Sequence, residues 1–397
     1  MVNPSKPRVL MLYDFPLHGG GSGAYVRYLS LRLVEAYQYE LAIAAPDEES
    51  IDSAIKHYPL KLPQVPVYLG RPGLESSKKY SQLSPPEIAD LYRVFIDGTI
   101  RAVEEFKPDL IHVHHIMINA WAARFIRSIY GTRFILTSHG SCLQAISRDR
   151  RYFRLSRDAL RAANAVTVVS GDTRVKLLKM FGRDLSGKTR TIPGGVRLSL
   201  FPEIRSNVDP LRQKLGLEDK KVALFTGRII SEKGVEYLVK AAKTIKGQVI
   251  IAGDGPQRAK LEELIQKMQL NNVLFLPYVK KYEEFLDLYY LADVFVSPAV
   301  WDEPLGLTII EAMAAKTPVI VTRKGGVTMA VKDGVNGFFV RPRNSTEIAS
   351  AVNKLFANPG LVRKMGERGR AVVEKRFTWT KIAERFDRLY RNVYLNR

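Results

Sequence analysis

Short apolar runs rich in β-branched residues alternate with longer segments of helical period along this chain, and the alternation starts afresh near its middle. Apolar runs without polar alternation indicate strands buried on both faces, and the helical segments between them act as crossover connections. A chain with this pattern is expected to form doubly wound parallel sheets covered by helices on both faces. Two rounds of the pattern predict two such α/β domains.

The expected strands form two groups. The first group comprises Arg8–Asp14, Leu41–Ala45, Asp109–His115, Arg133–Ser138 and Ala165–Ser170. The second group comprises Lys221–Thr226, Gln248–Ala252, Val273–Leu276, Asp293–Ser297, Pro318–Thr322 and Gly337–Val340. A turn-rich segment at 193–209 lies between them, so we expect domains at 1–195 and 196–376. The tail at 377–397 has an amphipathic helical period, and we expect it to pack back onto the first domain.

The composition narrows the class of protein. The 397 residues suffice for two cores, and no apolar run reaches the roughly 20 residues that a membrane-spanning helix needs. The apolar run from Val9 to Tyr13 is too short for the core of a signal peptide. Cys142 is the only cysteine, which excludes a disulfide within the chain. Together these features favour the cytoplasm.

The net charge of +21 predicts an anionic partner. Motifs typical of nucleic-acid binding are absent, so we expect no nucleic acid. The anionic partner could be a nucleotide diphosphate, a phosphorylated or lipid-linked acceptor, or an anionic membrane surface. The stretch at 148–161 carries six arginines and two aspartates among apolar residues. This is typical either of a solvated helix face or of a peripheral contact with the inner face of the membrane.

A glycine-rich loop follows the first expected strand, where parallel sheets bind ligands. It has the sequence His18-Gly19-Gly20-Gly21-Ser22-Gly23. Without a Cβ in the way, the backbone N–H groups of Gly20 and Gly21 can approach a phosphate at the start of a helix. A tight strand-to-helix turn would also explain the glycines, and the spacing matches neither the dinucleotide fingerprint nor a P-loop.

Two further segments follow strands of the second half. Gly227-Arg228 and Lys233-Gly234 come after the strand that ends at Thr226, so a guanidinium and an ammonium can bracket a diphosphate there. The turn Gly253-Asp254-Gly255-Pro256 follows the next strand. A cap and a first-turn proline explain that turn structurally, with a backbone contact to a nucleotide as a second interpretation.

The strongest local signal is the segment from Ser297 to Met313, which contains two carboxylates. Glu303 lies in the loop before an expected helix, and Glu311 lies on the second turn of that helix. A carboxylate can accept two hydrogen bonds from the vicinal hydroxyls of a ribose. His139 ends another expected strand, which favours a place in a ligand site, although a lone histidine is more often structural.

Taken in order, these segments resemble the retaining glycosyltransferases of the "glycosyl transferases group 1" family, also called family 4. The resemblance covers essentially the whole chain. It rests on Gly19–Gly21, His139, Ile192-Pro193-Gly194-Gly195-Val196, Gly227-Arg228, Lys233-Gly234, Gly253-Asp254-Gly255-Pro256, Glu303 with Glu311-Ala312, Gly325-Gly326 and Phe377-Thr378-Trp379. It implies the GT-B architecture, in which two Rossmann-like domains face each other across a cleft.

The resemblance also implies roles. Arg228 and Lys233 would hold the donor diphosphate, Glu311 the ribose, and Glu303 the transferred sugar. The backbone at Leu305, Gly306 and Leu307 would also contact the donor, and His139 would lie near the anomeric centre. Glycines 20, 21, 227 and 253 complete the expected donor contacts. The first domain would bind the acceptor and the second the nucleotide sugar.

The implied reaction moves a sugar from a UDP- or GDP-sugar to an alcohol acceptor, with retention and without a cofactor or metal. The chain contains no Asp-x-Asp pair, the usual metal ligand of metal-dependent transferases. A sugar phosphorylase or a nucleotide-sugar epimerase of the same architecture is the alternative. Departures from the common pattern at Gly194, Met329 and Pro304-Leu305 leave the donor sugar open.

Overall fold

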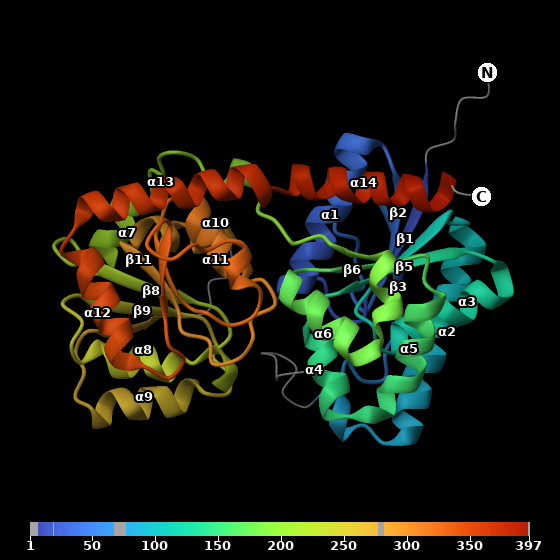
Figure 1. Ribbon diagram of the computed structural model, residues 1–397, viewed down its shortest axis with the longest axis horizontal. Coiled ribbons are helices and arrows are strands. Elements are labelled where there is room, and N and C mark those ends of the chain that lie inside the picture. The colour runs from blue at the N-terminus through green and yellow to red at the C-terminus, as the bar shows by residue number, and fades with distance from the viewer. Residues whose placement is uncertain (1–6, 19, 67–76, 277–281, 396–397) are drawn as a thin grey trace. The chain divides into compact units, whose positions relative to one another are not determined.

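The computed structural model describes residues 7–18, 20–66, 77–276 and 282–395. Its contacts divide the chain into two compact units. Unit 1 contains the described residues up to Gly194 together with those from Trp379 onward, and unit 2 contains Gly195–Thr378. Each unit alternates helices with parallel strands, as expected (Figure 1).

Within the described residues, unit 1 forms a seven-stranded parallel sheet in the order β3-β2-β1-β4-β5-β6-β7. The strands are β1 Arg8–Leu12, β2 Glu40–Ala45, β3 Ile55–Pro59, β4 Leu110–His114, β5 Arg133–Ser138, β6 Ala165–Val168 and β7 Thr189–Thr191. The helices are α1 Gly21–Tyr37, α2 Pro85–Phe106, α3 Ile118–Tyr130, α4 Ser141–Arg148, α5 Phe153–Ala162, α6 Gly171–Phe181 and α14 Trp379–Leu395. Short 3₁₀ helices are η1 Tyr80–Gln82, η2 Arg150–Tyr152 and η3 Arg183–Lys188.

The strand order of unit 1 reverses between β1 and β4, which are paired neighbours. Crossovers between parallel strands are right-handed. The crossover through α1 leads from β1 to β2, and the crossover through α3 leads from β4 to β5 in the opposite direction across the sheet. The two helices therefore lie on opposite faces. Accordingly, α3 packs against α2 and α5, whereas α1 packs against the C-terminal helix α14. Ligands of open α/β sheets bind at such a reversal, beyond the carboxyl ends of the strands.

Within the described residues, unit 2 forms a six-stranded parallel sheet in the order β10-β9-β8-β11-β12-β13. The strands are β8 Val222–Thr226, β9 Gln248–Ala252, β10 Val273–Leu276, β11 Val294–Ser297, β12 Val319–Thr322 and β13 Gly337–Val340. The helices are α7 Val208–Lys214, α8 Val235–Ala242, α9 Arg258–Lys267, α10 Tyr282–Leu291, α11 Leu307–Ala314, α12 Ser345–Phe356 and α13 Pro359–Arg376. The 3₁₀ helices are η4 Leu198–Leu200, η5 Ser231–Lys233 and η6 Gly326–Met329.

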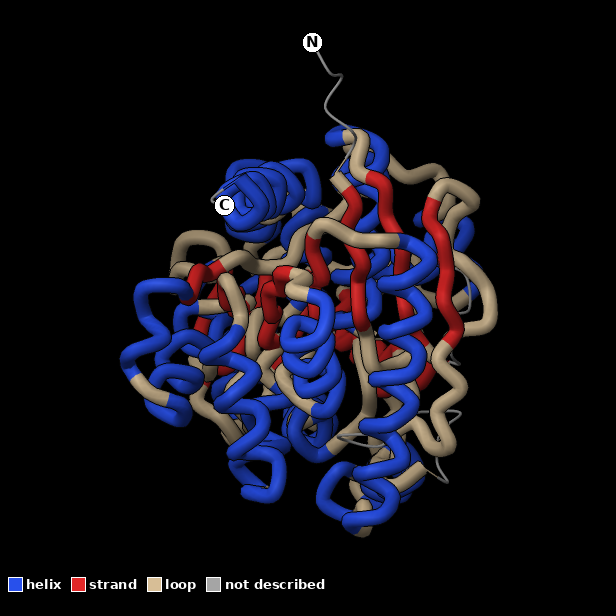
Figure 2. Tube along the Cα trace, turned by 90° about the vertical axis from the view of Figure 1, so that its right-hand side faces the viewer, coloured by secondary structure: helices blue, strands red, loops and turns tan. Residues whose placement is uncertain are grey.

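The strand order of unit 2 reverses between β8 and β11, which pair directly. The α8 and α9 helices pack together on one face with α12, and α10 and α11 pack on the other with α7 and α13. Figure 2, in which unit 1 faces the viewer, shows helices packed beside the strands. Both sheets are largely buried on both faces, and every residue of β4 and of β8 is buried.

The predicted strands are all present, with small differences at their ends. Two strands escaped prediction, and both lie at an edge of the unit 1 sheet. β3 contains Lys56 and His57, and β7 has the sequence Thr-Arg-Thr. Because an edge strand pairs on one side only, it does not need a continuous apolar run, which was the signal used for the other strands.

Helix α14 belongs to unit 1, although it follows α13 of unit 2 directly in the sequence. Its apolar face buries Ile382, Phe386 and Tyr390. Its Asp387 accepts a hydrogen bond of 2.9 Å from the hydroxyl of Tyr39. Among the described residues, no helix is both long enough and apolar enough to cross a membrane.

Candidate functional site

The reversal point of unit 2 brings together two loops that are far apart in the sequence. One loop follows β8 and contains Gly227-Arg228 and η5, and the other follows β11 and leads to α11. Phe295 of β11 lies beside Leu224 of β8, so the loops leave the sheet as neighbours. Arg228 is half-buried immediately after β8. The predicted donor-binding residues of unit 2 therefore gather at this edge of the sheet.

Lys233 and Glu303 form an ion pair across these loops. The Lys233 Nζ lies 2.5 Å from Oε2 of Glu303, and the two side chains are 19% and 10% exposed. The indole N–H of Trp301 donates to the same oxygen at 3.1 Å. A pair that is largely shielded from water interacts more strongly than a surface pair. The structure thus joins two residues for which the resemblance implies separate roles, Lys233 at the diphosphate and Glu303 at the sugar.

The backbone of Glu303 is held in place by the loop after β12. The Gly326 N–H donates to the Glu303 carbonyl at 2.7 Å, and Gly325 forms a parallel bridge with Glu303. Gly325 has a φ of +75°, and a Cβ there would lie 2.2 Å from the Glu303 carbonyl oxygen. The paired glycines therefore serve to bring this loop close enough to fix the orientation of Glu303.

Glu311 projects from the second turn of α11, where two tyrosines of α10 hold its carboxylate. The hydroxyl of Tyr282 donates to Oε1 at 2.8 Å, and that of Tyr289 donates to Oε2 at 2.7 Å. Tyr289 also bonds to Thr226 at the end of β8, at 2.9 Å. Burial raises the pKa of Glu311, and the hydrogen bonds from Tyr289 and Tyr282 act in the opposite direction.

Sequence reasoning missed both tyrosines. They are seven residues apart, which places them on one side of a helix two turns apart. A buried tyrosine hydroxyl usually has a hydrogen-bond partner. The seven-residue spacing could therefore have indicated that both hydroxyls share a polar partner on one side of this helix. Their partner Glu311 lies on another helix, and only the packing of α10 beside α11 brings the three side chains together.

Two predicted glycine contacts have a steric explanation. Gly253, with a φ of +153°, leaves no room for a Cβ, which would lie 1.9 Å from the carbonyl oxygen of Gly227. Gly306, with a φ of +80°, is the residue before α11, and a Cβ would meet Ile309 at 2.6 Å. Leu305 is buried, and Leu307 begins the helix. These residues therefore shape the loops around Arg228 and Glu303.

In unit 1, the glycine loop leads into α1. Gly19 lies outside the described residues. Gly20 is extended with nothing near the position of a Cβ, and Gly21 begins α1. By contrast, a Cβ on Gly23 would lie 2.3 Å from the carbonyl oxygen of Leu17. The tight turn accounts for Gly23, and the predicted role of Gly20 and Gly21 at a phosphate stays an expectation.

His139 lies at the end of β5, beside three histidines at the end of β4. We call His112, His114, His115 and His139 the histidine cluster. His139 Nε2 lies 3.1 Å from Nδ1 of His114, and its ring is 4.8 Å from that of His115. Burial lowers the pKa of all four, to about 3 for His115. The cluster is therefore neutral near pH 7.

Asp14 follows β1 and faces the cluster. Its Oδ1 lies 4.0 Å from Nε2 of His115, and its Oδ2 accepts a hydrogen bond of 2.9 Å from Tyr80. Burial raises the pKa of Asp14 to about 7. The reversal between β1 and β4 thus collects four neutral histidines beside a carboxyl that is protonated more readily than an exposed one. Sequence reasoning found only His139 here, although the run His112-Val113-His114-His115 at a strand end was visible.

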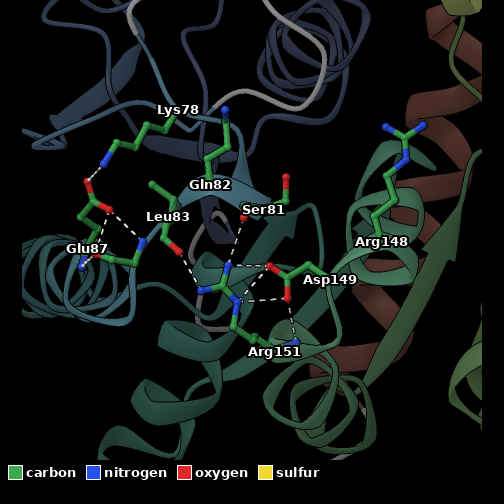
Figure 3. Close-up of a pocket in the computed structure, with 9 residues that line it drawn as sticks. Lys78, Ser81, Gln82, Leu83, Glu87, Arg148, Asp149 and Arg151 are labelled. Carbon is green, nitrogen blue, oxygen red and sulfur yellow. Dashed lines mark hydrogen bonds and ion pairs between the residues drawn. The ribbon is translucent and has the colours of Figure 1, made fainter.

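A surface pocket of about 610 Å³ lies elsewhere in unit 1, between η1, the start of α2 and η2. Arg151 binds Asp149 and donates to the carbonyl of Leu83, and Lys78 pairs with Glu87 (Figure 3). Arg148 points away from this network in Figure 3. None of the predicted site residues lines the pocket. Among the described residues, no three His, Cys, Asp or Glu side chains are placed to hold a metal ion.

Comparison with known proteins identifies the family. The family model described as "Glycosyl transferases group 1" matches residues 207–372, and "Glycosyltransferase Family 4" matches residues 19–200. The chain belongs to the group 1 glycosyltransferases of family 4. This glycosyltransferase is 29% identical to α-maltose-1-phosphate synthase of Mycolicibacterium smegmatis, over 70% of this chain and 78% of that one. It is 33% identical to α-D-kanosaminyltransferase of Streptomyces kanamyceticus, over 47% and 49%.

Solved structures share the fold of this glycosyltransferase. Sucrose-phosphate synthase from Thermosynechococcus elongatus aligns with a TM-score of 0.82 and 25% identity, covering 99% of this chain and all of that one. HepE of Anabaena, crystallised with UDP, aligns with a TM-score of 0.76 and 19% identity, covering 97% and 100%. The predicted two-domain GT-B fold and the predicted family are confirmed.

Proposed function

We propose that this glycosyltransferase transfers a sugar from a UDP- or GDP-sugar to an alcohol acceptor, with retention of the α configuration of the donor. The observation that carries the proposal is the grouping of Arg228, Lys233, Glu303 and Glu311 at the reversal point of unit 2. The structures of HepE with UDP and with UDP-glucose, and of a starch synthase with ADP, support a nucleotide sugar as donor.

The leaving diphosphate needs positive charge. Breaking the glycosyl–phosphate bond places negative charge on the diphosphate while the sugar becomes oxocarbenium-like. Arg228 and Lys233 supply two cations from the loop after β8, and the N-terminus of α11 adds a favourable dipole. Because these groups supply the counter-charge, the proposed reaction proceeds without a metal. In this scheme Glu303, which pairs with Lys233, accepts a hydrogen bond from the transferred sugar.

Glu311 is suited to bind a ribose. Tyr282 and Tyr289 each use one lone pair of the carboxylate, and each oxygen keeps further acceptor capacity. The tyrosines also fix the side chain in one orientation, so that two vicinal hydroxyls can bind without further ordering of Glu311. This arrangement supports a nucleotide ligand.

In unit 1, the neutral histidine cluster suits a sugar rather than an anion. His139 is half-buried, and its lowered pKa makes it a weak base. We therefore assign it to positioning of the sugar. The acceptor proton then passes to the leaving phosphate as the acceptor attacks the same face of the sugar. No acceptor base is required in this scheme.

The exposed face of α5 supports a peripheral contact with an anionic membrane. Arg154, Arg157 and Arg161 are exposed along this helix, together with Leu155, which is 49% exposed. Arginines around an exposed apolar side chain favour the surface of an anionic bilayer. An acceptor linked to lipid would then be presented to unit 1.

The anomeric configuration of the product tests the reaction. The enzyme is first screened against nucleotide sugars by thermal stabilisation, because a tight ligand raises the melting temperature. With the donor so found and an alcohol acceptor, we expect an α-linked product by NMR in excess EDTA. A β-linked product would contradict retention, and activity restored only by magnesium would contradict metal independence. Donor consumption that needs phosphate but no alcohol would identify a phosphorylase instead.

A further inference from the structure

The imidazole rings of His112, His114 and His139 form a continuous row that begins at α14. The ring centroids of His112 and His114 are 4.1 Å apart, and those of His114 and His139 are 5.4 Å apart with an interplanar angle of 23°. Phe386 of α14 lies against His112 at 5.1 Å. The rings therefore cannot tilt independently, since each is packed against the next.

The end of the stack at His112 is fixed by two hydrogen bonds. Its Nδ1 bonds to the hydroxyl of Tyr390 on α14 at 2.5 Å, and its Nε2 bonds to Oγ1 of Thr137 at 2.6 Å. Both ring nitrogens are thus engaged, and a ring flip would break both bonds. His112 is completely buried, so water cannot replace these partners.

The other end of the stack fixes His139. The bond between Nδ1 of His114 and Nε2 of His139 joins two neutral rings, so one nitrogen carries the proton and the other is bare. His114 Nε2 is buried and has no hydrogen-bond partner among the described residues. A buried N–H without a partner is rarer than a buried acceptor without one. A proton on Nδ1 of His114 is therefore favoured, because the buried Nε2 is then an acceptor without a hydrogen bond rather than a donor without one.

We propose that His114 is a positioning residue that donates its Nδ1–H to Nε2 of His139 and thereby holds His139 in the Nδ1–H tautomer. The only nitrogen of His139 then available to a ligand is a donor, suited to an oxygen of the transferred sugar. This ligand assignment rests on the proposed glycosyl transfer. The tautomer itself follows from the geometry of unit 1 alone.

The tautomer can be measured without any substrate. In protein labelled with ¹⁵N-histidine, long-range ¹H–¹⁵N correlations distinguish the protonated from the bare nitrogen of each ring. We expect the wild-type His139 to carry its proton on Nδ1. An Nε2–H tautomer would overturn the proposal, whether or not the enzyme transfers sugar. Loss of all nucleotide-sugar turnover with an Nδ1–H tautomer would contradict the proposed function instead.

Two variants of His114 separate positioning from packing. His114→Phe keeps a ring in the stack but removes the donor, and we expect mixed tautomers at His139 and about tenfold lower kcat. His114→Asn can place its amide N–H near the position of Nδ1, and we expect it to restore the single tautomer and most of the kcat. If His114→Phe left tautomer and kcat unchanged, or if both variants lost them equally, His114 would not act through this bond.

A matched pair of tyrosines tests the far end. Tyr390→Phe removes the hydroxyl that holds His112, whereas Tyr39→Phe removes a hydroxyl that donates to Asp387 of the same helix. We expect the first to broaden the His139 resonances and to lower kcat less than His114→Phe does, while the second leaves both unchanged. Equal effects of the two changes would show that α14 acts through stability alone.

Discussion

At the reversal point of unit 2 the key side chains carry charge, whereas at that of unit 1 they are neutral. The reversal point of unit 2 has Lys233, Glu303 and Arg228 around it, and that of unit 1 has the histidine cluster. All six histidines of the chain lie in unit 1. Two sheets of the same topology thus provide different chemistry because different residues follow their strands. Charge suits a departing diphosphate, and neutral hydrogen-bonding groups suit a sugar.

The sharpest test of this contrast removes the charge from unit 2. We expect Lys233→Ala to lower kcat by about 10²-fold or more, because a counter-charge to the leaving diphosphate is lost in the transition state. Lys240→Ala, which removes an exposed lysine paired with Glu236 within α8, is the matched control and should leave kcat unchanged. Steady-state kinetics on both folded variants decides. Wild-type turnover in Lys233→Ala would contradict the assignment.

A smaller effect is expected at Glu311. Glu311→Gln replaces an acceptor oxygen by a donor, so we expect the nucleotide to bind more weakly by about 1–3 kcal/mol. Calorimetry with UDP and with GDP measures the change, and Glu262→Gln on α9 serves as the control. Tyr289→Phe should weaken binding less, since it only frees the carboxylate to move. Unchanged affinity in Glu311→Gln for the nucleotide that wild type binds would refute the ribose contact.

Acid should distinguish the two units. The pKa values of the clustered histidines are lowered in the fold, so the unfolded chain takes up protons that the folded chain does not, and stability falls as pH falls through 6.5. Each histidine that stays neutral in the fold lowers the free energy of unfolding by about 0.7 kcal/mol between pH 7 and 6. Amide exchange should show this loss in β4 and β5 but not in β8 and β11.

Asp14 should offset part of that acid effect. Its pKa is raised to about 7, so the folded chain takes up this proton first and Asp14 adds stability as pH falls from 7 towards 4. We therefore expect Asp14→Asn to make the acid loss in β4 and β5 steeper. A shallower loss in this variant would show that the pKa of Asp14 is not raised in the fold.

The weakest expected effect concerns α5. Each arginine near an anionic bilayer contributes about 1 kcal/mol, so Arg154→Gln or Arg157→Gln should reduce binding to anionic vesicles roughly fivefold. Arg363→Gln changes an exposed arginine of α13 and is the control. Flotation with anionic and with zwitterionic vesicles provides the measurement. If wild-type binding were absent or insensitive to salt, the face of α5 would be an ordinary solvated surface.

Local sequence pattern sufficed for the elements that are buried on both faces. The strand β8 was predictable because apolar residues dominate it, and the positions of Arg228, Lys233 and Glu303 were predictable because they follow expected strands. The pairing of Lys233 with Glu303 was not predictable, because the two residues are 70 positions apart and meet only through packing of the sheet. The same holds for Tyr289 with Glu311 and for Tyr390 with His112.

The placement of α14 has a consequence for how the chain folds during synthesis. Among the described residues, unit 2 lies within the single stretch Gly195–Thr378, whereas unit 1 combines residues before Gly195 with those after Thr378. A ribosome therefore synthesises Gly195–Thr378 before it adds Tyr390, the partner of His112. Domains usually fold from the N-terminus onward as the chain emerges. Here the unit that starts first is completed last, so the nascent histidine cluster waits for the final helix.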